Sequence, residues 1–124
     1  MSPALRRQLS IDPEYTRCAF AGIDHPAGPC AGRITREHAI IYAGKKIQER
    51  WAIIPCCAKH HAVDEYQDAG TMNKRMNKWA ALNRATDEDL AKYDRANYKQ
   101  ERDLLNREFG PYEPRKTKEE CRCY

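Results

Sequence analysis

The stretch Cys57-Ala58-Lys59-His60-His61 places one thiol and two imidazoles within five residues. Cysteine and histidine are typical ligands of zinc, and such a cluster seldom arises for packing alone. On a helix, Cys57 and His60 lie three positions apart and can reach one ion, whereas His61 points about 100° away from His60. The spacing therefore predicts a helix that extends to Tyr66 or Gln67 and serves two metal sites.

The size and composition of the chain predict one small domain. It has 124 residues, of which 32% are charged and 41% hydrophobic, and its mean hydropathy is −0.91. A modest core of this kind gains from a metal ion that crosslinks it. No run approaches the roughly 18–20 apolar residues of a membrane helix, and the first residues lack the apolar segment of a signal peptide. We therefore expect a cytoplasmic protein that does not enter a membrane.

Cysteine usage supports metal binding in that compartment. The six cysteines are expected to be metal ligands or free thiols, and the alternative is a disulfide-rich secreted domain. His25 is a reserve ligand, and Cys56 is expected to be a small buried thiol that can also replace Cys57. Cys121 and Cys123 receive no role.

Basic charge is concentrated in the first half of the chain. Residues 1–61 contain nine Lys and Arg against five Asp and Glu, whereas residues 62–124 contain thirteen of each. Clustered basic side chains attract polyanions, although a solvated basic surface is the alternative. Six of them flank the metal candidates and are predicted to bind nucleic acid: Arg33, Arg36, Lys45, Lys46, Arg50 and Lys59.

Composition and periodicity divide the chain into four predicted segments. These are a loose arm at 1–15, a metal-binding domain at 16–70, a helical extension at 71–110 and a polar tail at 111–124. Within the second segment, a loop rich in Gly and Pro is expected to bring Cys18 and Cys30 together.

Two strands are predicted in the metal-binding domain. Residues Ile34 to Ile41 form the first, and Trp51 to Ile54 form the second, which Pro55 is expected to stop. The polar stretch 42–50 between them is expected to be a loop.

The extension is predicted to contain two helices. The first carries Met72, Met76 and Trp79 at helical spacing, and the second begins at a Thr86 cap and continues to Phe109. Gly110-Pro111 is expected to end it.

The order strand, turn, strand, helix, with Glu37-His38 ending the first strand and Cys57-x-x-His60-His61 on the helix, resembles the HNH endonuclease superfamily. This is the ββα-metal fold, and small phage-encoded zinc-containing members are most similar. The resemblance spans Cys18 to Tyr66. It implies an α+β fold with a small zinc-stapled ββα-metal core and a C-terminal helical extension.

The resemblance also implies a role for each ligand. A structural zinc would be held by Cys18, Cys30, Cys57 and His60, and a catalytic Mg²⁺ or Mn²⁺ by His61. Hydrolysis of a phosphodiester needs a base for water and a cation at the phosphoryl oxygens. We assign His38 as the general base and Glu37 as a ligand of the catalytic cation opposite His61. Because neighbouring strand residues face opposite ways, this assignment requires a strand end or a bulge.

The sequence departs from the family pattern at two places. Asp or His is usual at the Glu37 position, and the window Arg50–Pro55 lacks the Asn of the family name. A turn at Gly70 would bring Asn73 and Asn77, which follow the predicted helix, back to the site.

The expected function is that of a metal-dependent DNA endonuclease in phage-related DNA processing or recombination, in the cytoplasm of a bacterial host. The alternative is a non-catalytic zinc-stabilised nucleic-acid-binding or adaptor module. DNA is the expected partner, and a homodimer or a recombination or packaging protein stays open.

Overall fold

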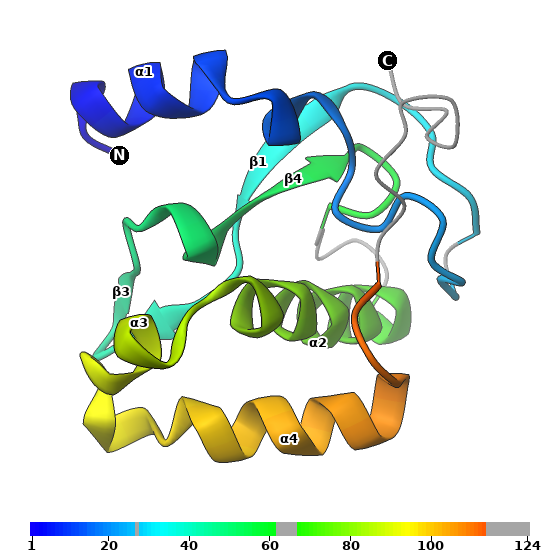
Figure 1. Cartoon of the computed structure of the whole chain (residues 1–124). Helices are drawn as coiled ribbons and strands as arrows, with labels where there is room; N and C mark the ends of the chain where they lie inside the picture. The colour runs from blue at the N-terminus through cyan, green and yellow to red at the C-terminus, as the bar shows by residue number, and fades with distance from the viewer. Residues whose placement is uncertain (27, 62–66, 114–124) are drawn as a thin grey trace.

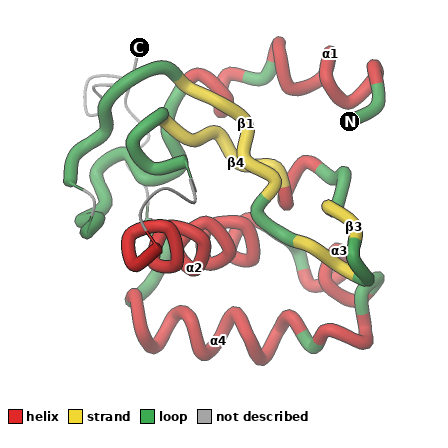
Figure 2. Tube along the Cα trace, turned by 180° about the vertical axis from the view of Figure 1, so that it is seen from behind, coloured by secondary structure: helices red, strands yellow, loops and turns green. Residues whose placement is uncertain are grey.

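The computed structural model describes residues 1–26, 28–61 and 67–113. Its elements are α1 (Pro3–Ile11), η1 (Pro13–Thr16), β1 (Ile34–His38), β2 (Ile41–Tyr42), β3 (Lys45–Lys46), η2 (Arg50–Ala52), β4 (Ile53–Cys57), α2 (Gln67–Arg84), α3 (Asp87–Ala91), η3 (Asp94–Ala96) and α4 (Tyr98–Phe109), where η marks a short 3₁₀ helix. An antiparallel sheet of β1 and β4 lies between α1 and α2, and α4 packs beyond α2 (Figure 1). Figure 2 shows the same order from behind. The predicted α+β class is confirmed.

The first fifteen residues, predicted to be a loose arm, contain α1 and most of η1. The Ser2 side chain caps α1 by accepting a hydrogen bond from the Leu5 amide at 3.1 Å. Leu9 and Tyr15 are buried and pack with Ile53 of β4. Leu5, four residues before Leu9 on the same helix, packs against this cluster.

Strand β4 runs through Pro55, so the prediction that this proline ends the strand is wrong. Pro55 lies opposite Arg36 of β1, and its carbonyl accepts a hydrogen bond from the Ala19 amide at 2.7 Å. In an antiparallel ladder the N and O of one residue point to the same side, so the missing N–H of Pro55 faces away from β1. No ladder bond is lost. Trp51 and Ala52, predicted to belong to this strand, form η2.

The predicted first strand divides after His38. Beyond it, β2 pairs with β3 in a short antiparallel hairpin that forms a second sheet, where a loop was predicted. Its two turn residues, Ala43 and Gly44, both have positive φ angles, 53° and 80°. Two left-handed residues in succession match the twist of a hairpin, which allows strands this short to pair.

The predicted helix over Cys57–Tyr66 does not begin where expected. Cys57 is the last residue of β4, and a turn follows in which the amides of His60 and His61 both donate to the Cys57 carbonyl, at 3.1 and 2.9 Å. The rest of that prediction, at 62–66, lies outside the described residues. The end of β4 and the turn after it, and not a helix, therefore bring Cys57 and His60 close together.

Helix α2 supplies much of the core below the sheet. Met76, Trp79 and Leu82 are at most 2% exposed, and the helix packs against β4, η2 and α4. Gly70 lies inside α2, so the chain does not turn back there.

The predicted second helix of the extension is divided into α3 and α4. Thr86 caps α3 as predicted, in a reciprocal capping box with Asp89. The break comes at Asn97, whose φ of 49° is left-handed, and α4 then ends at Gly110 as predicted. The tail prediction is described only to residue 113, so Cys121 and Cys123 lie outside the described residues.

Within the described parts of the chain, none of the helices has both the length and the apolar content of a membrane-spanning segment.

Tyr15 joins the N-terminal helices to the sheet and to α2. Its hydroxyl lies within hydrogen-bond distance of the carbonyls of Arg50 and Ile53, and it accepts a hydrogen bond from Arg84 Nη2 at 2.8 Å. Burial raises the pKa of Tyr15, so the phenol stays neutral and able to donate. Arg50 also bonds Asp12 at 2.8 Å, and this bond lowers the pKa of Asp12.

Replacing Tyr15 with Phe is expected to lower the free energy of unfolding by about 1–3 kcal/mol, because buried partners of the hydroxyl lose their hydrogen bonds. Chemical denaturation measures this change. Tyr42→Phe is the matched control: the Tyr42 hydroxyl makes no hydrogen bond within the described residues, and its removal should change stability by less than about 0.5 kcal/mol. Equal effects of the two substitutions would contradict the assignment.

Candidate metal centre and the adjacent polar site

Three cysteines and one histidine bring their ligand atoms together on one side of the sheet. Each of these atoms lies within 4.8 Å of the others, and the four residues are Cys18, Cys30, Cys57 and His60. Two come from the loop between η1 and β1, one from the end of β4 and one from the following turn. The structure therefore contains a Cys3His group that can bind a metal ion such as zinc.

The distances suit a tetrahedral zinc centre. The Nδ1 atom of His60 lies 3.3 Å from the sulfur of Cys57, 3.6 Å from that of Cys18 and 3.8 Å from that of Cys30. With Zn–S bonds of about 2.3 Å and Zn–N bonds of about 2.0–2.1 Å, a sulfur and a nitrogen ligand lie about 3.6 Å apart. Four protein ligands of this type are typical of a closed structural site, and sulfur donors favour zinc over magnesium or calcium.

Backbone groups orient two of the ligands. The sulfur of Cys18 accepts hydrogen bonds from the amides of Phe20 and Cys57, both at 3.4 Å. On the other side of the centre, His60 Nε2 donates to the Gly28 carbonyl at 2.7 Å, which leaves Nδ1 facing the sulfurs. Outer contacts of this kind fix the tautomer of a histidine ligand and the direction of its ring.

The electrostatic environment of the Cys3His group favours the thiolate form of Cys18. Hydrogen bonds from the thiols of Cys30, Cys56 and Cys57 lower the pKa of Cys18. Burial lowers the pKa of His60, but contacts with Cys18 and Cys57 raise it further, to about 10. Without a metal, the imidazolium proton therefore balances the negative sulfur. A metal ion takes the place of that proton when it binds.

Cys56 and His25 lie beside the group and outside it. The hydrogen bond to Cys18, together with burial, raises the pKa of Cys56, so this residue is a neutral donor to a ligand. His25 stacks on His60, with ring centroids 4.1 Å apart. Burial, followed by the charge of His60, lowers the pKa of His25 to about 4. The four described cysteines are free thiols.

Gly32 allows the loop to approach the turn after β4. Its φ is +85°, and a Cβ at this position would lie 2.7 Å from the Cβ of Ala58. The neighbouring Ala31 carbonyl accepts a hydrogen bond from the Lys59 amide at 3.2 Å. Contact between backbones therefore holds the loop of Cys30 against the turn of His60.

A second polar site begins at the next residue of the chain. His61 Nδ1 lies 2.8 Å from Thr35 Oγ1, and Thr35 donates its own proton to the Cys56 carbonyl, also at 2.8 Å. Thr35 must then accept from His61, so Nδ1 carries a proton. The other nitrogen, Nε2, faces Glu37 Oε2 at 2.8 Å. Two acceptors at this distance repel each other unless a positive charge lies between them, either a proton on Nε2 or a metal cation.

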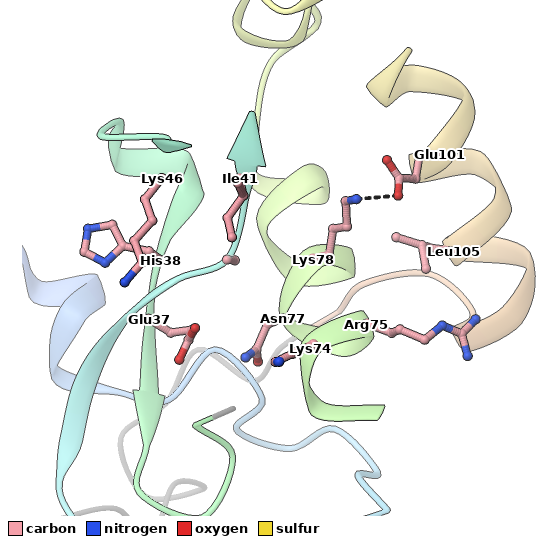
Figure 3. A pocket seen from close by; sticks show the side chains of 11 residues that line it. Glu37, His38, Ile41, Lys46, Lys74, Arg75, Asn77, Lys78, Glu101 and Leu105 are labelled. Atoms are coloured by element: carbon pink, nitrogen blue, oxygen red, sulfur yellow. Dashed lines mark ion pairs between the residues drawn. The ribbon is translucent and has the colours of Figure 1, made fainter. Parts of the chain in front are cut away.

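His38 lies on the opposite face of β1. The ladder is regular through His38, which pairs with Ile53, so the bulge needed to bring it beside Glu37 is not formed. Its Nε2 lies 3.2 Å from Gln48 Oε1. Figure 3 shows the His38 ring pointing away from the Glu37 carboxylate. Both residues nevertheless line the same pocket.

Asn73 and Asn77 reach the site from α2. Asn73 Nδ2 lies 3.5 Å from the His61 carbonyl, and Asn77 lines the pocket that contains Glu37. They come back because α2 packs below the sheet. The four-residue spacing places both on one face of a helix, which is the sequence signal that could have selected them.

The predicted nucleic-acid-binding residues differ in exposure. Arg33, Lys45, Lys46 and Lys59 are exposed, and Arg36 is half-buried. Arg50 instead pairs with Asp12 and Glu14, so its guanidinium connects η2 to the N-terminal segment.

Comparisons with protein-family models, curated proteins and solved structures found no match to this chain.

Replacing Cys57 with Ser is expected to weaken zinc binding by more than the roughly 10–100-fold that loss of an outer-shell partner costs. It should also lower the melting temperature of zinc-loaded protein, because a zinc ion bound by the group would join the loop to β4. Competition with a chromophoric chelator measures affinity, and the absorption of Co²⁺-substituted protein reports tetrahedral sulfur ligation. Cys56→Ala is the matched control and should keep one bound metal. Loss of the site in Cys56→Ala, or an unchanged affinity in Cys57→Ser, would exclude this ligand set.

Gly32→Ala and Gly44→Ala separate backbone strain from crowding. Both glycines have a positive φ, but no atom lies within 4 Å of a Cβ at Gly44. We expect Gly44→Ala to cost about 1–2 kcal/mol of stability through its left-handed backbone alone. Gly32→Ala adds a clash with Ala58, which costs about 1–3 kcal/mol more, and should also weaken zinc binding. Denaturation with and without zinc measures both effects, and equal losses would show that the loop can move away from the turn.

Proposed function

We propose that the chain is a metal-dependent DNA endonuclease with an HNH-type core. In this proposal the Cys3His group holds a structural zinc, and Glu37 and His61 hold a catalytic Mg²⁺ or Mn²⁺. One observation carries it: Glu37 and His61 face each other at 2.8 Å, and His61 directly follows His60 of the metal centre. A carboxylate is a preferred ligand of Mg²⁺ and Mn²⁺, and an imidazole is a common ligand of divalent transition metals.

The hydrogen bonds of the His61 imidazole support its role as a cation ligand. With its Nδ1 proton donated to Thr35, the lone pair of Nε2 is directed at the Glu37 carboxylate. Thr35 therefore acts as the outer partner that orients a metal-binding histidine. A divalent cation bound there would neutralise charge on the phosphoryl oxygens and activate water.

His38 is proposed as the general base, acting from the pocket that it shares with Glu37. Both residues line this pocket, so a phosphodiester bound there comes within reach of both faces of the β1 end. A neutral imidazole can accept a proton from water at physiological pH. The products would carry a 5′-phosphate and a 3′-hydroxyl, as the resemblance implies.

Exposed basic residues support DNA as the partner. Arg33, Lys45, Lys46 and Lys59 are exposed, and they can contact phosphates without breaking an ion pair given by the described residues. The proposed setting is phage-related DNA processing in a bacterial cytoplasm.

The alternative is a non-catalytic zinc-stabilised module that binds nucleic acid or acts as an adaptor. Two observations favour it. His38 and Glu37 leave β1 on opposite faces of a regular ladder, and η2 and β4 contain no Asn in the window Arg50–Pro55.

Cleavage of supercoiled plasmid tests the proposal. Zinc-loaded protein is expected to cut in the presence of Mg²⁺ or Mn²⁺, and His38→Ala should slow cutting by about 10²–10⁴-fold, the contribution of a general base. His61→Ala should also abolish cutting, because it removes a cation ligand.

Gln48→Ala is the matched control for His38→Ala. It removes the partner of the imidazole and keeps the base, so its rate should stay within a few-fold of the unmodified chain. Protein that holds zinc and binds DNA but does not cut with either ion would support the adaptor module and contradict the endonuclease.

A further inference from the structure

A pocket of about 580 Å³ lies between the β1–β3 region and the helices α2 and α4. This volume is within the range of small-ligand sites, roughly 300–1,000 Å³. Figure 3 shows Glu37 and Asn77 directed toward one another at one end, with Lys74 beside Asn77. Glu37, the partner of His61, is therefore part of the pocket lining next to Asn77.

Asn77 is an unusual component of this pocket. Its side chain is 1% exposed, and neither Nδ2 nor Oδ1 has a hydrogen-bond partner among the described residues. Asn83, six residues later on the same helix, donates to the Trp79 carbonyl and to Asn106 Oδ1, both at 2.8 Å. Buried amides are nearly always paired, so an unpaired one aimed into a pocket indicates a ligand.

The charge of the pocket favours an anion. Four cationic side chains line it, three of them from α2: Lys46, Lys74, Arg75 and Lys78. Two acidic residues also line it, and each has a partner of its own. Glu37 pairs with His61, and Glu101 pairs with Lys78 at 2.6 Å. Two of the cations therefore have acidic partners, Lys78 with Glu101 and Arg75 with Glu108 outside the lining, and the lining itself still contains two more cationic than acidic side chains.

We infer that this pocket binds one nucleotide unit of a DNA strand, with Asn77 as its polar anchor and Lys74 as a phosphate contact. The inference rests on the proposed function, because it names where the substrate strand lies. The Asn77 amide can donate through Nδ2 to a phosphodiester oxygen and accept through Oδ1 from an N–H or O–H of a base or sugar. Inorganic phosphate lacks the base and sugar groups of the second contact.

DNA binding without cleavage tests the pocket. The probe is a fluorescein-labelled 12-base single strand, or the corresponding duplex, added to zinc-loaded protein without Mg²⁺ or Mn²⁺. Asn77→Leu keeps the approximate volume and removes both polar atoms. It should weaken binding by about tenfold or more. It should leave the melting temperature equal or higher, because an unpaired buried amide is removed.

Two further variants sharpen the test. Asn77→Asp keeps the shape of the side chain and places a negative charge against the phosphate, so it should weaken binding at least as much as Asn77→Leu. Lys74→Gln should weaken binding and reduce the slope of log affinity against log salt by about one. Lys92→Gln is its matched control, because Lys92 pairs with Glu49 away from the pocket and carries the same charge.

Each outcome decides the inference. Unchanged binding by both Asn77 variants overturns it, and so does a lower melting temperature in Asn77→Leu, since that would show a structural role for the amide. Thymidine monophosphate or inorganic phosphate competing as well as DNA, at equal phosphate concentration, overturns the assignment to a polynucleotide.

The same design separates this inference from the proposed function. Asn77-dependent binding by protein that never cuts plasmid supports the pocket and contradicts the endonuclease. Plasmid cutting with unchanged rate and affinity in Asn77→Leu supports the endonuclease and overturns the pocket.

Discussion

Four ligand atoms converge on one point, and this convergence constrains how the loop before β1, the end of β4 and the following turn lie relative to one another. Cys18 and Cys30 lie at the two ends of a loop rich in Gly and Pro, and the group joins that loop to β4 and the turn after it. The loop contains little regular structure that could hold it in place. A metal ion bound by this group would supply a crosslink that a core of this size gains from, as in other small domains.

The geometry of this centre also positions the second polar site. His60 is held by three sulfurs and by the Gly28 carbonyl, and the chain direction at His61 follows from that. Thr35 and Glu37 lie on one face of β1, two residues apart, and both reach the His61 ring. The Cys3His group therefore positions one partner of the Glu37–His61 pair, and the regular β1–β4 ladder positions the other.

The opposite side of the sheet depends on ordinary packing. Trp79 of α2 is buried against Phe109 and Tyr112, and its Nε1 donates to Asn106 Oδ1 of α4 at 2.9 Å. This packing holds α2 below the strands with its Asn77 face toward Glu37. The Cys3His group on one side of the sheet and the helix packing on the other thus both position residues around Glu37.

Short-range chemistry made several features predictable. Thr86 and Asp89 specify a capping box, Gly110 ends α4, and the spacing of Cys57 and His60 selected two members of the Cys3His group, to which the family resemblance added Cys18 and Cys30. The two helix ends and the Cys57–His60 pair depend on residue types at fixed offsets along the chain, and such offsets are visible in a sequence.

Other features were settled only by the tertiary structure. Pro55 stays in β4 because its missing N–H faces the outer edge, and the Cys57–His60 spacing is met by a turn because β4 continues to Cys57. The face on which His38 leaves β1 depends on an unbroken ladder. Asn77 meets Glu37 across 40 positions because α2 packs below the sheet. Strand register and helix docking arise from contacts between distant residues, which local patterns do not encode.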